Sequence, residues 1–212
     1  MQNKPFFYDI TLRDGNQALR KPWNLEEKEI IFKKLLELGV QGIEVGFPNA
    51  SEMDFEAVEH LSEIAPDNVI ISALARCVEA DIRKAAEAIK KAPRPRIHTF
   101  MAMNPLGIEY VIKKPLSEIK EICINAVKLA KSLLPEKGDV EFSVEHFGDC
   151  VENLDEVIEA LKEIVEAGAT TINLPNTVER FRPLTFVKMV EKVKQALPEN
   201  IIISVHCHND LG

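Results

Sequence analysis

The sequence lacks the features that would place the chain in a membrane or on a nucleic acid. No uninterrupted apolar run approaches the length of a membrane-spanning helix, and the first residues contain no signal-peptide core. Basic residues are outnumbered, with 26 Lys and Arg against 34 Asp and Glu, and the formal net charge is -8. This balance argues against a nucleic-acid or anionic-membrane partner. The cytoplasm is therefore the expected location.

Cysteine and glycine patterns exclude further classes. The chain has four cysteines, and no two of them form a C-x-x-C pair. Neither a structural zinc knot nor a disulfide framework is predicted, and the thiols are expected to be reduced. The glycine-rich phosphate turn of dinucleotide-binding folds does not follow the first expected strand. No Gly/Ser-rich linker divides the chain.

The sequence does contain a regular alternation of apolar β-type runs and amphipathic helical patterns. Strands are expected at 6–10, 42–47, 69–74, 96–101, 140–144, 170–174 and 201–205. Helices are expected from Asn24 to Gly39, from near Ser51, over about 80–91, from near Ser117, over 153–167 and from Pro183. Residues 104–115 are expected to form a longer loop.

Seven βα steps, spaced by roughly thirty residues, predict a parallel sheet in a single α/β domain over residues 1–212. A doubly wound sheet and a (β/α)8 TIM barrel both fit this alternation. The missing phosphate turn favours the barrel, which would be incomplete because one strand and the last helices are lacking. The chain is thus expected to be a barrel truncated at its C-terminus.

The last expected strand ends in two histidines. Side chains alternate along a strand, so His206 and His208 should share one face with Ser204. Two imidazoles on one face can bind a divalent transition metal if a carboxylate or amide oxygen completes the site. On spacing alone, a purely structural role, in which both histidines form hydrogen bonds at a strand end, fits the sequence as well as a metal site does.

Other polar side chains stand in or just after expected strands, where buried parallel strands are normally apolar. They are Arg13, Asp14, Glu44, His98, Ser143, Glu145, Asn173 and Thr177. Burying so many polar groups is costly unless they serve one another or a ligand, and the strand ends of a barrel meet at one mouth. This convergence favours one functional site over a separate structural role for each of these residues.

The chemistry of these groups suggests roles. Asp14 can supply the anionic oxygen beside His206 and His208, and Arg13 has a planar fork suited to a carboxylate or enolate. Thr177 offers a hydroxyl donor, His98 a donor or base, and Glu145 a proton shuttle. Taken singly, each has a structural alternative: an Arg13–Asp14 surface pair, a solvated Glu145, or a structural His98.

Six segments together resemble the 2-isopropylmalate synthase family, which belongs to a wider group of TIM-barrel metal-dependent acyl-CoA synthases and lyases. The segments are Leu12–Leu19, Ile43–Pro48, Arg96–Phe100, Phe142–Glu145, Leu174–Val178 and His206–Asp210. They occur in the family's order over the whole chain. Residues 101–107, which follow the expected strand at 96–101, depart from the pattern common in the family. This leaves open the details of the part of the site that they would line.

The resemblance implies a Claisen-type condensation of acetyl-CoA with 2-oxoisovalerate and water, which gives 2-isopropylmalate and CoA in leucine biosynthesis. It makes Asp14, His206 and His208 ligands of a divalent cation, which would be Mg, Mn or Zn. It places Arg13, His98 and Thr177 on the keto acid and Glu145 in proton transfer. Leu74 and Phe100 would set the size of the acceptor.

The resemblance also implies that parts of the family's enzyme lie outside this sequence. These are an eighth-strand Asn ligand, a linker segment and a regulatory domain, and the full-length enzyme would be a homodimer. The 212-residue chain alone is expected to be inactive. The alternatives are a homocitrate or citramalate synthase, an acyl-CoA lyase, and a noncatalytic metal-binding barrel.

Overall fold

The computed structural model describes residues 5–209, so Asp210 of the last motif lies outside the described residues. Contacts divide the chain into two compact units. The first contains the residues up to His98 together with Leu133–Gly138, and the second contains Thr99–Ser132 and the residues from Asp139 onward. The expectation of one domain stays a prediction, and each unit is described by itself.

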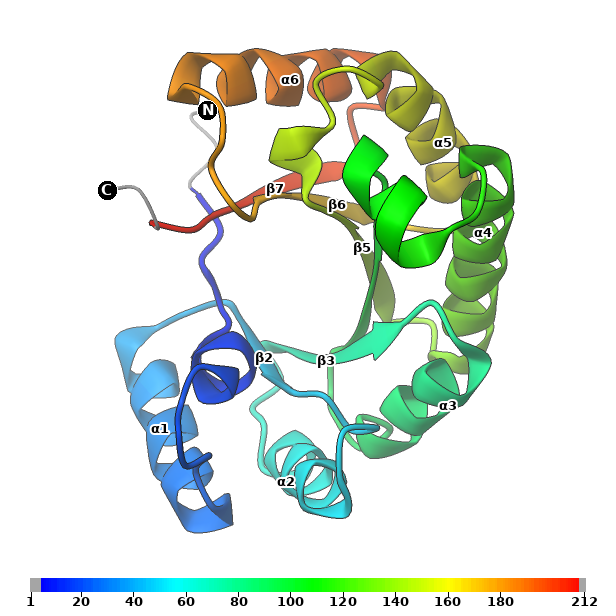
Figure 1. The fold of residues 1–212 in the computed structure, drawn as a ribbon. Coiled ribbons are helices and arrows are strands. Elements are labelled where there is room, and N and C mark those ends of the chain that lie inside the picture. Colours follow the sequence, from blue (N-terminus) through cyan, green and yellow to red (C-terminus); the bar gives the residue numbers. More distant parts are fainter. Residues whose placement is uncertain (1–4, 210–212) are drawn as a thin grey trace. The chain divides into compact units, whose positions relative to one another are not determined.

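The first unit repeats a strand followed by a helix (Figure 1). Its strands are β1 (Tyr8–Asp9), β2 (Gly42–Gly46) and β3 (Ile70–Arg76), and its helices are α1 (Leu25–Leu38), α2 (Glu52–Glu63) and α3 (Glu79–Ala88). One turn of π-helix, η1 (Thr11–Gly15), follows β1. Strand β4 (Pro95–Ala102) begins in this unit and continues into the second.

The second unit has the same alternation. Its strands are β5 (Asp139–Glu145), β6 (Thr171–Asn176) and β7 (Ile202–Cys207), and its helices are α4 (Leu116–Leu133), α5 (Leu154–Glu166) and α6 (Pro183–Ala196). A short π-helix, η2 (Gly107–Ile112), follows β4, and a short 3-10 helix, η3 (Phe147–Asp149), follows β5.

The strands follow one another through the sheet in chain order. In the first unit β1 pairs with β2 and β2 with β3, and in the second β5 pairs with β6 and β6 with β7, all in parallel. Strand residues such as Ile43, Ile71, Phe142 and Leu174 are fully buried. Because parallel strands place their carboxyl ends at one edge, residues that end neighbouring strands within each unit lie at the same edge.

Local signals explain why several elements begin and end where they do. The side chain of Asn24 accepts a hydrogen bond from the Glu27 N–H, and the Glu27 side chain accepts one from the Asn24 N–H. This capping box is as predicted. Gly39 ends α1 with φ of 85°, a conformation that suits glycine, and Pro183 opens α6.

Two local details differ from the sequence-based expectations. Strand β1 has two residues instead of five, because the chain turns into η1 after Asp9. The loop expected at 104–115 contains the short π-helix η2. Helix α5 begins where it was predicted, after Asn153, whose Nδ2 donates to the Met103 carbonyl at 2.8 Å. Among the described residues, no helix is both long and apolar enough to cross a bilayer.

Candidate functional site

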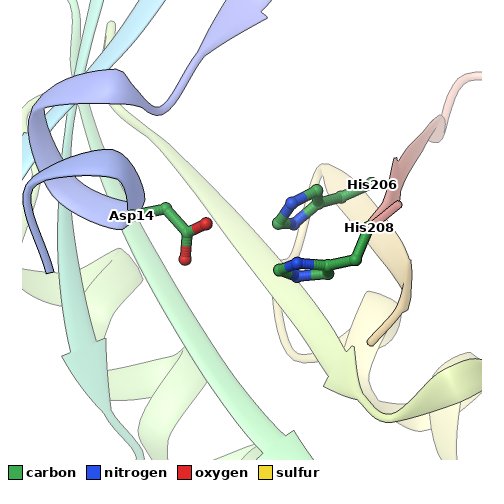
Figure 2. Close-up of side chains that lie close together, drawn as sticks. All are labelled: Asp14, His206 and His208. Carbon is green, nitrogen blue, oxygen red and sulfur yellow. The ribbon is translucent and has the colours of Figure 1, made fainter. Parts of the chain in front are cut away.

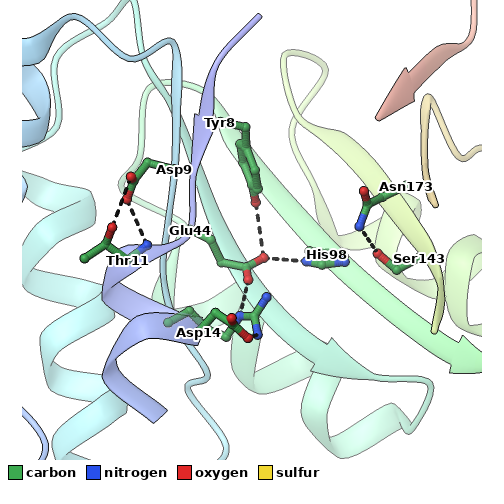
Figure 3. A network of polar contacts seen from close by, with 9 residues as sticks. Tyr8, Asp9, Thr11, Asp14, Glu44, His98, Ser143 and Asn173 are labelled. Atoms are coloured by element: carbon green, nitrogen blue, oxygen red, sulfur yellow. Dashed lines mark hydrogen bonds and ion pairs between the residues drawn. The ribbon is translucent and has the colours of Figure 1, made fainter. Parts of the chain in front are cut away.

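A fully buried carboxylate, Glu44 on β2, connects polar side chains of the first unit (Figure 3). Arg13 donates from Nε to one carboxylate oxygen, and the ring nitrogen Nδ1 of His98 contacts the other. The Tyr8 hydroxyl also donates to Glu44, at 3.2 Å. Three residues, from β1, η1 and β4, are therefore fixed around the one charge on β2.

The electrostatics of this group keep Glu44 ionised. Burial opposes the charge of Glu44, but the charges of His98 and Arg13 and their hydrogen bonds more than compensate, so the pKa of Glu44 lies far below its usual range. Burial also opposes the charge of Arg13, yet Glu44 and Asp14 raise the pKa of Arg13 above its ordinary value. An ionised Glu44 needs a donor at the His98 Nδ1, which fixes the orientation of that ring.

The turn η1 positions Arg13 and Asp14. The backbone N–H groups of Arg13 and Asp14 both donate to the Ile10 carbonyl, at 3.1 and 2.8 Å. Arg13 Nη1 donates to Asp14 Oδ1 at 2.5 Å, while the side chains are 12% and 34% exposed. Because Arg13 is largely buried and also bound to Glu44, the alternative of a simple surface pair is wrong.

The two histidines of the second unit lie as strand alternation predicts. His206, on β7, and His208, just after it, have ring centroids 4.5 Å apart (Figure 2). A ligand nitrogen of one lies within 4.8 Å of a ligand nitrogen of the other, and both residues are half-buried. Two accessible imidazole nitrogens at this spacing suit a divalent cation.

The remaining predicted residues lie on separate elements. Glu145 is half-buried at the end of β5, and Thr177 follows β6, where its Oγ1 accepts a hydrogen bond from the His146 N–H at 3.2 Å. Leu74 is 7% exposed on β3 of the first unit, and Phe100 is half-buried on β4. Their assigned roles stay predictions.

Sequence reasoning noticed Glu44 as a misplaced polar residue but gave it no role, and it missed Tyr8. A carboxylate in a strand that is otherwise apolar was the available signal. Its partners come from β1, η1 and β4, and a single sequence does not reveal which of those side chains meet.

The fold matches solved TIM-barrel enzymes. An HMG-CoA lyase from Bacillus subtilis is 19% identical with a TM-score of 0.74, and the match covers 98% of this chain and 69% of that one. Hydroxymethylglutaryl-CoA lyase from Pseudomonas aeruginosa gives 17% identity and a TM-score of 0.74 over 97% of this chain and 68% of that one. The predicted incomplete (β/α)8 barrel, with seven parallel strands, is confirmed.

The HMGL-like family profile matches residues 4–212, and the chain belongs to this family. It is 55% identical over 208 residues to "2-isopropylmalate synthase 2" of Leptospira interrogans. This match covers 98% of this chain and 49% of that protein. It is 43% identical over 214 residues to "2-isopropylmalate synthase 2, chloroplastic" of Arabidopsis thaliana, covering 97% of this chain and 33% of that protein. The chain spans half or less of the length of these relatives.

Proposed function

We propose that this chain is the catalytic barrel of a 2-isopropylmalate synthase, which condenses acetyl-CoA with 2-oxoisovalerate and releases 2-isopropylmalate and CoA. The observation that carries the proposal is 55% identity to a protein of that name over 98% of the chain. The paired imidazoles at the end of β7 and the charged group around Glu44 supply chemistry that the reaction needs.

The residues fit a divalent cation. His206 and His208 present neighbouring nitrogens, and Asp14 is a half-exposed carboxylate, the kind of third ligand that completes such a set. We assign these three residues as ligands of Mg, Mn or Zn. The cation, when bound, supplies a Lewis acid for the keto-acid oxygens.

The chain's own residues bind and orient the substrates. Arg13 is held through Nε and Nη1 by Glu44 and Asp14, so its planar fork is pre-oriented for the carboxylate of the keto acid. His98, whose ring Glu44 orients, hydrogen-bonds the same substrate. Leu74 and Phe100 limit the size of its side chain.

Proton transfer falls to residues of the second unit. The Thr177 oxygen accepts the His146 N–H, so its own hydroxyl hydrogen remains to donate to the keto acid. Glu145, half-buried at the end of β5, takes a proton from the acetyl methyl group. A homodimer and a cytoplasmic location remain predictions from the sequence.

The test is CoA release from acetyl-CoA by the protein at its full native length, with Mg or Mn and 2-oxoisovalerate, pyruvate or 2-oxoglutarate as acceptor. Release that prefers 2-oxoisovalerate and is abolished in His206→Ala supports the proposal. Preference for another acceptor would make the protein a sibling synthase. Absence of release with all three acceptors would leave a lyase or a noncatalytic barrel.

A further inference from the structure

The residue after Glu145 has an unusual backbone. His146 adopts φ of 58° and ψ of 32°, a left-handed conformation that is uncommon for residues other than Gly, although Asn, Asp and His adopt it more often than the rest. Its N–H donates to Thr177 Oγ1 at 3.2 Å, and its carbonyl accepts from the Asp149 N–H at 2.9 Å. The thiol of Cys150 also lies 3.6 Å from that carbonyl. The backbone of His146 is therefore held on both sides.

The thiol of Cys150 stays protonated at neutral pH and can donate a hydrogen bond to the His146 carbonyl. Burial and then the charge of Asp149 raise the pKa of Cys150 to about 12. A buried, protonated thiol is chemically inert, so the reactive group of this turn is not the cysteine.

The imidazole of His146 faces a nearly buried carboxylate. Its Nδ1 lies 3.5 Å from Asp149 Oδ2, and the His146 and Asp149 side chains are 32% and 7% exposed. The Nδ1 atom is buried and, within residues 5–209, no group lies close enough to form a normal hydrogen bond with it. One ring edge thus points at a carboxylate inside the protein, while a third of the side chain reaches solvent.

A second charged residue faces the same carboxylate. Arg180, in the segment between β6 and α6, lies with Nε 3.6 Å from Asp149 Oδ1. Its neighbour Glu179 is also left-handed, with φ of 50°. Asp149 therefore stands between an imidazole and a guanidinium, and both approach it without closing a short hydrogen bond.

An imidazole backed by a carboxylate is suited to taking a proton in one step and returning it in a later one. In such an arrangement the carboxylate favours the tautomer with its hydrogen on Nδ1, which leaves Nε2 as the proton acceptor. A residue whose only role was to close the turn would need neither the imidazole nor the buried acid, since Gly adopts this backbone more readily.

We propose that His146, oriented by Asp149, is a further catalytic residue, which activates the water that cleaves the thioester after condensation. Nε2 takes one proton from the water, and the water oxygen bonds to the thioester carbon. The C–S bond then breaks, its electron pair leaves with sulfur, and the proton passes from Nε2 to the CoA thiolate. Glu145 keeps the separate task of removing the methyl proton. This inference rests on the proposed function.

The test compares full-length wild type with His146→Asn and Asp149→Asn in single turnovers with acetyl-CoA and 2-oxoisovalerate. Asn tolerates the left-handed backbone, so the first variant removes the imidazole but leaves the turn intact. We expect CoA release to slow by about a hundredfold in His146→Asn, while the condensed acyl-CoA adduct accumulates and is detected by mass spectrometry. We expect release to slow by roughly tenfold in Asp149→Asn.

Matched controls are His60→Gln, a histidine paired with Glu29 on α1, and Asp155→Asn, which is 91% exposed on α5. Both should release CoA at the wild-type rate. Wild-type release by His146→Asn, or slow release without the adduct, would overturn the role of His146 and leave the proposed function standing. Wild type that forms neither adduct nor CoA would overturn the proposed function itself.

Discussion

At the scale of single residues, the fully buried Glu44 ties Arg13 and His98 together. Replacing it by Gln would leave the largely buried Arg13 without its counter-charge. We expect Glu44→Gln to lower the free energy of unfolding by about 3 kcal/mol at pH 7, measured by urea denaturation. The exposed Glu56→Gln is the control and should change it by less than about 0.5 kcal/mol.

The stability difference between wild type and Glu44→Gln should also depend on pH. The pKa of Glu44 is lowered by folding, so its stabilisation is complete above the unfolded pKa of about 4.3 and is lost as the pH falls below that value. The stability difference between wild type and Glu44→Gln should therefore be largest at pH 7 and shrink towards pH 3. A difference independent of pH would contradict an ionised Glu44.

The histidine pair makes a prediction that does not depend on turnover. Titration calorimetry with Mn²⁺ should detect one ion per chain in the wild type, and His206→Ala or His208→Ala should weaken its affinity by more than about tenfold. His60→Ala, which removes a histidine that contacts Glu29, is the control. Equal Mn²⁺ affinity in all four proteins would rule out the pair as ligands.

At the scale of elements, the capping box of Asn24 and Glu27 sets the start of α1. Asn24→Ala should lower the free energy of unfolding by about 1 kcal/mol, whereas Asn24→Ser keeps a capping oxygen and should lose far less. Thermal melting of the two variants measures this difference. Identical melting temperatures would show that tertiary packing alone fixes the helix start.

Elements with a strong local signal were predictable from the sequence, and those without one were not. The Asn24 cap and the Gly39 stop located α1, Pro183 located the start of α6, and strand alternation paired His206 with His208. The turn η1 has no periodic pattern of its own, and therefore β1 was predicted too long. The contacts around Glu44 and the left-handed turn at His146 depend on packing between distant segments, which periodicity does not report.

At the scale of the whole molecule, the chain is an HMGL-like barrel that spans 49% of its Leptospira relative. We propose that the full-length protein joins the enolate of acetyl-CoA to 2-oxoisovalerate through a new carbon–carbon bond. In the proposed mechanism, Glu145 removes the methyl proton, and Arg13 and His98 hold the acceptor.

The most direct test supplies the full-length protein with acetyl-CoA that is isotopically labelled in the methyl group, together with 2-oxoisovalerate, and identifies the product by mass spectrometry. We expect labelled 2-isopropylmalate in an amount equal to the CoA released. Labelled acetate in place of that product would show that the protein hydrolyses the thioester without forming the carbon–carbon bond, and would contradict the proposed reaction.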